Sequence, residues 1–182
     1  MSAIYEDLQA FQPSNEAEAR DRGLMLQRAQ SDEAYRRGWP SHFTASAWVV
    51  NPERTKTLMV YHNIYQSWSW IGGHADGYRD LSLVAAKELE EETGVTNARK
   101  VGGLLSCEIL TVNGHTKRGI PISSHLHLNA TYLFEVAETE EIRIAPEENS
   151  DVRWFTFEEA LKASTEPWMV EHVYRKLIER SR

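Results

Sequence analysis

The 182-residue sequence contains a single cysteine and no apolar run of the length that a transmembrane helix needs. One cysteine, Cys107, excludes an intramolecular disulfide and is typical of a protein from the reducing cytoplasm. The first residues also lack the basic and then apolar order of a secretion signal. We therefore expect a cytoplasmic protein that does not enter a membrane.

Positive charge is also scarce, since 20 lysines and arginines stand against 27 acids and leave a net charge of −7. Proteins that bind nucleic acid polymers neutralise phosphates with basic side chains, so this balance argues against a general polymer binder. A charged nucleotide remains compatible as a ligand, because a bound metal would invert the local charge. The hydrophobic content of 41% is ordinary for a globular chain, and this length is sufficient for one core.

Residues 73–95 combine a glycine-rich turn with a helical pattern that ends in a group of acids. In a helix over about 81–93, Glu88, Glu91 and Glu92 fall within an arc of about 100° that continues the apolar stripe. Sheltered carboxylates so close together repel one another and resist ionisation, a conflict that a hard divalent cation removes. Oxygen ligands suit Mg²⁺ or Mn²⁺. The alternative is an amphipathic helix with an acidic last turn, which opposes the helix dipole.

This segment resembles the Nudix box of the Nudix hydrolases. That box reads Gly, five residues, Glu, seven residues, Arg-Glu, an aliphatic residue, any residue, Glu-Glu, any residue, Gly and an aliphatic residue. The positions that match in register are Gly73, Glu88, Leu89, Glu91, Glu92, Gly94 and Val95. Two positions depart, because Arg79 stands in place of the first Glu and Lys87 in place of Arg. Lys87 keeps the charge but cannot orient a carboxylate through two parallel hydrogen bonds. Arg79 is a surface residue ahead of the helix, a charge that weakens the metal site, or an added contact to phosphate.

The resemblance implies a role for each matching residue. Glu88, Glu91 and Glu92, with the backbone carbonyl of Gly73, would hold the Mg²⁺ or Mn²⁺ ions. These ions would bind and polarise a small-molecule diphosphate and activate the water that attacks it. The substrate would be a nucleoside diphosphate derivative or a similar organic diphosphate. In many members an acid on a later loop, near Glu148 here, reaches the metals or serves as the base; a solvated loop is the alternative. Dimers are common in the family, so the resemblance also admits a homodimer.

Two other functions use the same fold. The departures at Arg79 and Lys87 would suit a catalytically weak ligand sensor or interaction module. Some relatives isomerise organic diphosphates with a catalytic cysteine and glutamate, but Cys107 lies outside any evident matching motif.

The periodicity of apolar residues predicts a mixed α/β fold. Strands are expected over 42–50, 57–62, 67–71, 101–112, 123–136 and 152–155, and helices over about 15–30, 81–93 and 166–181. The resemblance sharpens this prediction to the Nudix fold, a mixed sheet between helices (α/β/α). Residues 1–40 are expected to form an N-terminal helical extension with an irregular lead over 1–13, and residues 41–182 the Nudix domain.

Two pairs of ring side chains are further candidates for ligand contact. His125 and His127 share one face of a strand, and that face lines a substrate pocket or meets water. Their spacing also occurs in zinc sites, but the sequence offers no evident third ligand. Trp68 and Trp70 share a face ahead of the glycine turn, where they either stack on a flat group of the substrate or pack in the core.

Overall fold

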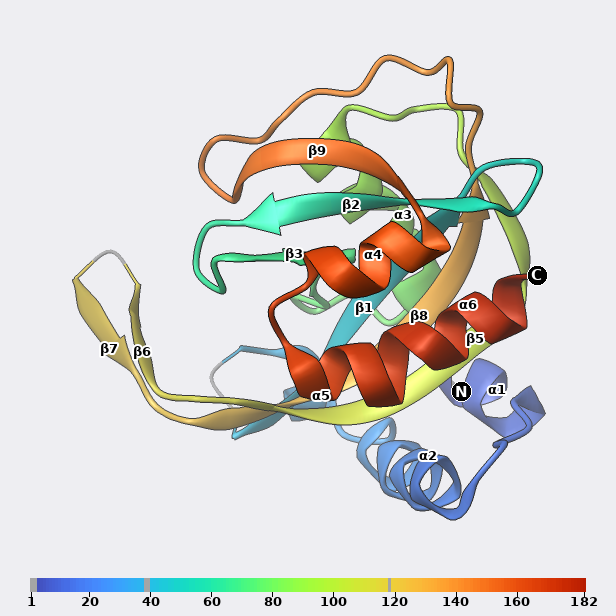
Figure 1. Cartoon of the computed structure of the whole chain (residues 1–182). Coiled ribbons are helices and arrows are strands. Elements are labelled where there is room, and N and C mark those ends of the chain that lie inside the picture. The colour runs from blue at the N-terminus through green and yellow to red at the C-terminus, as the bar shows by residue number, and fades with distance from the viewer. Residues whose placement is uncertain (1–2, 38–39, 118) are drawn as a thin grey trace.

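A computed structural model describes residues 3–37, 40–117 and 119–182 (Figure 1). Its strands are β1 (Ser41–Val50), β2 (Lys56–His62), β3 (Ser67–Ser69), β4 (Ile71–His74), β5 (Arg99–Val112), β6 (His115–Lys117), β7 (Ile120–Ile122), β8 (His125–Glu135) and β9 (Asn149–Thr156). Its helices are α1 (Ala3–Ala10), α2 (Glu16–Arg28), the 3-10 turn η1 (Asp32–Tyr35), α3 (Leu81–Thr93), α4 (Phe157–Ala163), α5 (Pro167–Met169), the π-helical turn η2 (Val170–Tyr174) and α6 (Arg175–Ser181). None of the helices in these described ranges has the length and apolar character needed to cross a membrane.

The main sheet has seven strands, and β1 lies at its centre. On one edge β1 pairs in parallel with β8, which pairs in turn with β5. On its other edge β1 pairs with β4 along residues 44–47 and with β2 at residues 49–50. Strands β3 and β9 both pair with β2, and every pair except β1–β8 is antiparallel. The predicted mixed sheet is confirmed. Strands β6 and β7 form a separate hairpin that projects from the body of the molecule (Figure 1).

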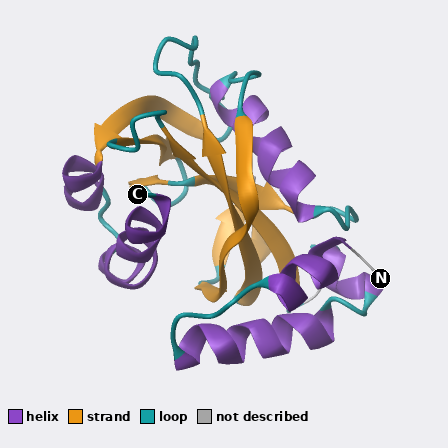
Figure 2. Cartoon of the chain, turned by 90° about the vertical axis from the view of Figure 1, so that its right-hand side faces the viewer, coloured by secondary structure: helices purple, strands orange, loops and turns teal. Residues whose placement is uncertain are grey.

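Helices cover both faces of the sheet, as Figure 2 shows. Along β1, alternate residues such as Phe43 and Val49 belong to the core that also contains the buried side of α3. The side chain of Trp48 points to the opposite face, where it packs with residues of the C-terminal helices such as Tyr174 and Leu177. A strand covered on both faces is buried along nearly its whole length, as β1 is. The predicted α/β/α architecture is therefore confirmed.

The N-terminal segment folds onto the same core. The prediction of an irregular lead over 1–13 was wrong for residues 3–10, because Ala3–Ala10 forms helix α1; residues 11–13 are irregular, and residues 1–2 lie outside the described ranges. Ile4 and Leu8, one helical turn apart, are fully buried, and they join the main core together with Met25 of α2. Burial of this short apolar stripe supplies the stability that an isolated eight-residue helix lacks. The N-terminal helices thus extend the main core.

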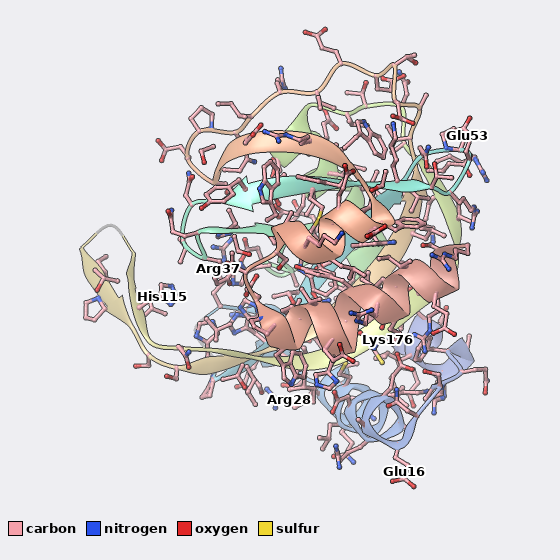
Figure 3. The ribbon with its side chains drawn as sticks, in the orientation of Figure 1. Glu16, Arg28, Arg37, Glu53, His115 and Lys176 are labelled. Carbon is pink, nitrogen blue, oxygen red and sulfur yellow. The ribbon has the colours of Figure 1, made fainter. Side chains whose placement is uncertain are left out.

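A buried ion-pair network ties α2 to the C-terminal helix. The Glu18 carboxylate accepts hydrogen bonds from Arg180 at 2.6 and 2.8 Å and from Lys176 at 3.2 Å. Lys176 also donates to Glu108 of β5 at 2.7 Å. Burial alone would raise the pKa of Glu18, but hydrogen bonds from Arg180 and the Ser14 N–H, with the charge of Lys176, lower it to about 2. Figure 3 shows Lys176 on the C-terminal helix, above α2.

Candidate active site

Helix α3 begins and ends where its sequence predicts. Asp80 accepts hydrogen bonds from the N–H groups of Ser82 and Leu83 at 3.1 and 3.2 Å and so caps the first turn. Gly94 ends the helix in a left-handed conformation with φ of 77°, which glycine adopts without strain. Apolar residues of α3, including Leu81 and Leu89, are fully buried in the core. This packing fixes the rotation of the helix and therefore the direction of its acids.

Three carboxylates converge beside the C-terminal half of α3. Glu88 and Glu92 come from the helix, and Glu148 comes from the loop that precedes β9; one oxygen of each lies within 4.8 Å of the others. Glu92 is buried, Glu88 is half-buried and Glu148 is exposed. The structure thus brings the predicted loop acid, Glu148, to two of the predicted helix acids.

Glu91 does not point into this group. The expectation that all three box acids share the sheltered face was wrong for Glu91, whose side chain is 55% exposed and pairs with Lys87 at 2.6 Å. A spacing of four residues places Lys87 and Glu91 on the same outer edge of the helix. The negative charge of Glu91 is nevertheless close enough to contribute to the raised pKa of Glu88.

Two of the converging carboxylates, those of Glu88 and Glu92, resist ionisation. Burial, together with the negative charges of Glu148 and Glu91, raises the pKa of Glu88 to about 7. Burial, together with repulsion from Glu148 and Glu88, raises the pKa of Glu92 to about 8 despite a hydrogen bond from the Gly72 N–H. Placing negative charge here is costly without a cation, because the carboxylates are partly removed from water and close to one another. A bound divalent cation would satisfy all three.

Two glycines connect the acids to a pocket. The Gly72 N–H donates to Glu92 Oε1 at 2.9 Å, and the Gly73 backbone lies against the Glu88 carboxylate so closely that a Cβ atom would overlap it. Gly72 and Gly73 also line a pocket of about 570 Å³ on the face of the sheet that carries the C-terminal helices. The acids themselves are not part of its lining. A ligand that spans the glycine pair could therefore present one end to the acids and the other to the pocket.

The pocket wall combines aromatic and polar side chains. Its lining includes Tyr65, Trp70, Trp168, His127, Asn129 and Glu166. Asn129 is held from β1, because its Oδ1 accepts hydrogen bonds of 2.9 Å from both Thr44 and Ser46. Such a wall suits an organic group with flat and polar parts.

A sequence model of the NUDIX domain matches residues 40–179. This chain belongs to the Nudix family. A search of the curated proteins gave no match. Several solved structures share this fold. The dihydroneopterin triphosphate pyrophosphohydrolase of E. coli matches with a TM-score of 0.57 and 10% identity, over 75% of this chain and 94% of that chain. An Ap4A hydrolase of C. elegans matches with a TM-score of 0.53 and 17% identity, over 76% of this chain and 93% of that chain. The NUDIX domain of Shewanella oneidensis NrtR with ADP-ribose matches with a TM-score of 0.51 and 19% identity, over 77% of this chain and 85% of that chain.

The first departure from the Nudix box, Arg79, faces the N-terminal helices. Arg79 forms an ion pair with Asp32, and its guanidinium lies 5.0 Å from the centre of the Tyr35 ring. The Arg79 carbonyl also accepts a hydrogen bond from the Ile4 N–H at 3.4 Å. Arg79 is thus occupied in holding residues that precede the Nudix domain.

Arg37 is a basic residue near the Nudix acids that the sequence analysis did not identify. Its guanidinium binds Asp76 through two hydrogen bonds of 2.5 and 2.6 Å, and the charges of Glu88 and Glu148 help to raise its pKa. Arg37 reaches this position from the segment after η1 (Figure 3). No motif marked it, because only the fold places that segment beside α3.

Of the two predicted tryptophans, one lines the pocket and the other packs against neighbouring side chains. Trp70 lines the pocket and meets Tyr174 edge-on at 5.9 Å. Trp68 does not line it, because its ring packs edge-on against Phe155 at 4.8 Å and lies beneath Arg153. The structure thus shows the packing contacts that were one of the two alternatives for Trp68, and its ligand role stays a prediction.

Both predicted histidines lie on the pocket side of the sheet. His127 lines the pocket, whereas His125 lies just beyond its wall. Two further histidines, His42 and His74, join them. Burial, together with the neighbouring histidines, lowers the pKa of His127 to about 2, so its ring stays neutral.

Proposed function

We propose that this protein is a metal-dependent pyrophosphohydrolase that cleaves the diphosphate of a nucleoside diphosphate derivative or a similar organic diphosphate. The observation that carries the proposal is the convergence of Glu88, Glu92 and Glu148 beside the Gly72–Gly73 pair, in a chain of the Nudix family. The pKa values of Glu88 and Glu92 are raised, which indicates a set of hard oxygen donors that lacks its counter-charge.

The donor set fits Mg²⁺ or Mn²⁺. Both cations take carboxylate and carbonyl oxygens, which Glu88, Glu92, Glu148 and the Gly73 carbonyl would supply. When bound, the cation neutralises diphosphate oxygens and lowers the pKa of a water molecule. The water attacks phosphorus, its proton passes to one of the carboxylates, and the bond from phosphorus to the bridging oxygen breaks.

A side-chain rotation would turn Glu91 toward this site. Its pair with Lys87 is exposed on both sides, and such pairs stabilise a protein by only about 0–1 kcal/mol. An incoming cation offers Glu91 a stronger partner than Lys87 does. Glu91, which faces solvent here, would then be a fourth carboxylate able to hold the cation.

Arg37 positions the phosphates. Its side chain is close enough to Glu88 and Glu148 for their charges to act on it, and its planar guanidinium suits phosphate oxygens. The organic part of the substrate then extends past the glycine pair into the pocket, where Trp70 and Trp168 offer flat surfaces.

The experiment measures the hydrolysis products released from organic diphosphates in the presence of Mg²⁺ or Mn²⁺, and again in the presence of a chelator. The panel begins with the compounds named for the structural relatives: ADP-ribose, Ap4A and dihydroneopterin triphosphate. We expect metal-dependent turnover of at least one member, and Glu92→Gln should lower its kcat by about 100-fold or more. The matched control is Glu90→Gln, an exposed acid of the same helix that is outside the carboxylate group. Equal turnover in both variants would contradict the proposed site.

A ligand-binding module without turnover is the second candidate. The observation in its favour is the pair between Lys87 and Glu91, which holds one box acid away from the others. A binding module of this kind should bind a member of the panel in the presence of metal and release no product. An isomerase that uses Cys107 is disfavoured, because this thiol is fully buried and burial raises its pKa strongly.

A cytoplasmic location, a homodimer and the division into an extension over 1–40 and a domain over 41–182 remain predictions. Size-exclusion chromatography with light scattering tests the dimer, and a chain truncated before residue 41 tests the division. Because Ile4, Leu8 and Met25 belong to the main core, we expect the truncated chain to be less stable than the full one.

A further inference from the structure

Four histidines from three neighbouring strands gather on the pocket side of the sheet. His42 of β1 lies directly opposite His127 of β8, and His125 is two residues from His127, so all three share a face. His74, at the end of β4, pairs with Thr44, which is two residues from His42 and therefore on the same side of β1. The strand register alone thus places all four rings together.

The ring nitrogens come close enough to share one ion. One nitrogen of each histidine lies within 4.8 Å of those of the other three. Nε2 of His125 and Nε2 of His127 are 3.2 Å apart. The ring centre of His42 lies 5.1 to 5.2 Å from those of His74, His125 and His127. His42 is 2% exposed and the other three are half-buried, so an ion at this point would be partly shielded from water.

We propose that His42, His74, His125 and His127 bind a transition-metal ion of the Zn²⁺ class, at a site separate from the carboxylates of the Nudix box. Neutral imidazole suits Zn²⁺, Cu²⁺, Ni²⁺ and Fe²⁺, whereas Mg²⁺ prefers oxygen. Four nitrogen donors match the four-coordinate geometry that Zn²⁺ takes in proteins. The two sites therefore differ in donor chemistry as well as in place.

Packing of the rings without an ion is the alternative, and it joins His125 and His127 by a single hydrogen bond. In neutral imidazoles, two Nε2 atoms at this distance require one to carry the proton and the other to offer its lone pair. A cation takes the lone pairs of both and removes this restriction on their tautomers.

The position of the ion gives it two consequences. His74 directly follows Gly73, so the ion would fix the end of β4 and with it the backbone beside Glu88. His74 and His127 also line the pocket, so the ion would lie at its wall, within reach of an anionic part of the ligand. It would thus stabilise the strands around the pocket even in the absence of Mg²⁺.

The test uses the full chain without a histidine tag, stripped by a chelator and titrated with Zn²⁺ in a calorimeter. Co²⁺ replaces Zn²⁺ in a parallel titration, because its visible absorption reports nitrogen ligation and four-coordinate geometry. We expect one Zn²⁺ per chain and a raised unfolding temperature. His125→Ala and His127→Ala should each lower the affinity by about 100-fold or more, since loss of even a second-shell partner costs about 10–100-fold.

Two control variants make the result specific. His115→Ala removes a neighbouring ring on the projecting hairpin, 6.3 Å from that of His125 and outside the group (Figure 3). Glu92→Gln removes a carboxylate of the other site. Both should bind Zn²⁺ as the wild type does, and circular dichroism should show that every variant is folded. The proposal is overturned if folded wild type fails to bind Zn²⁺, or if His115→Ala or Glu92→Gln weakens binding as much as His125→Ala does. Because no substrate is used, failure here leaves the proposed hydrolysis unaffected.

Discussion

Gly73 lies so close to Glu88 that a Cβ atom on residue 73 would overlap the Glu88 carboxylate. The backbone of β4 can approach a proposed metal ligand only because glycine has no side chain. Gly73→Ala should therefore displace the carboxylate and lower kcat by about 100-fold, the effect of a misplacement of about 1 Å. The free energy of unfolding should change by less than about 1 kcal/mol, because the displaced atoms end a flexible side chain.

The control for this substitution is Gly103→Ala, where an added Cβ meets no atom within 4 Å. Steady-state kinetics and urea unfolding of both variants make the comparison. If Gly73→Ala retained wild-type kcat, close approach at this glycine would have no part in the reaction.

Removal of divalent metal should make stability fall with rising pH. Glu92 has a pKa of about 8 in the folded protein against 4.5 when unfolded, so the folded state holds the extra proton between these values. Below pH 4.5 Glu92 is protonated in both states and does not change the free energy of unfolding. Between pH 4.5 and 8 this free energy falls, by a few kcal/mol at most, since one pKa unit is worth about 1.4 kcal/mol. Urea unfolding in chelator, at about pH 5 and about pH 8, measures this loss.

Glu92→Gln isolates that contribution. The buried neutral His127 acts in the opposite direction as pH rises toward 6.5, but it is common to both proteins and cancels in their difference. Wild type should lose stability relative to Glu92→Gln as pH rises, and saturating Mg²⁺ should restore it. A difference that stays constant with pH would show that Glu92 ionises normally.

Restoring the family residue at position 79 should not improve the enzyme. Arg79→Glu would place a negative charge beside Asp32 and remove the cation from the Tyr35 ring. We expect a loss of about 1–2 kcal/mol in unfolding free energy, from a cation–π contact and an exposed ion pair. Arg79→Gln is the neutral control and should lose less. A rise in both kcat and stability for Arg79→Glu would mean that this arginine weakens the metal site.

The ion pair between α2 and α6 should be essential for stability. Glu18→Ala leaves Arg180 without its buried carboxylate and leaves Lys176 with Glu108 alone, and removal of one partner from a buried ion pair costs about 3–5 kcal/mol. The control is Glu16→Ala, an exposed acid in the first turn of the same helix (Figure 3), which should cost about 0.3–1 kcal/mol. Urea unfolding of the two variants decides, and equal losses would contradict the assigned role of Glu18.

Local patterns allowed α3 and much of its chemistry to be predicted. Asp80, the apolar stripe and Gly94 all lie within residues 80–94, so this short segment carries the whole signal for the helix. The side-chain direction of Glu91 was missed, because helical spacing places it at the edge of the sheltered arc, where Lys87 competes for it. Rotation angle alone does not decide such an edge position.

Long-range pairing could not be predicted. His42 and His74 lie 32 residues apart in sequence and far from His125, and only the register of β1 with β4 and β8 joins them. Helix α1 was missed for a related reason, since its eight residues are too few to be helical without the core that buries Ile4 and Leu8. Helix and strand propensities depend on residues that are close along the chain, whereas these features depend on residues that the fold brings together.

The most direct measurement is a calorimetric titration of Mn²⁺ into chelator-treated protein, with Mg²⁺ as competitor. It compares wild type, Glu92→Gln and the helix control Glu90→Gln, and it needs no knowledge of the substrate. The carboxylate site predicts Mn²⁺ binding that Mg²⁺ displaces in wild type and Glu90→Gln, and an affinity at least about 10-fold weaker in Glu92→Gln. Equal Mn²⁺ affinity in all three proteins would contradict the account.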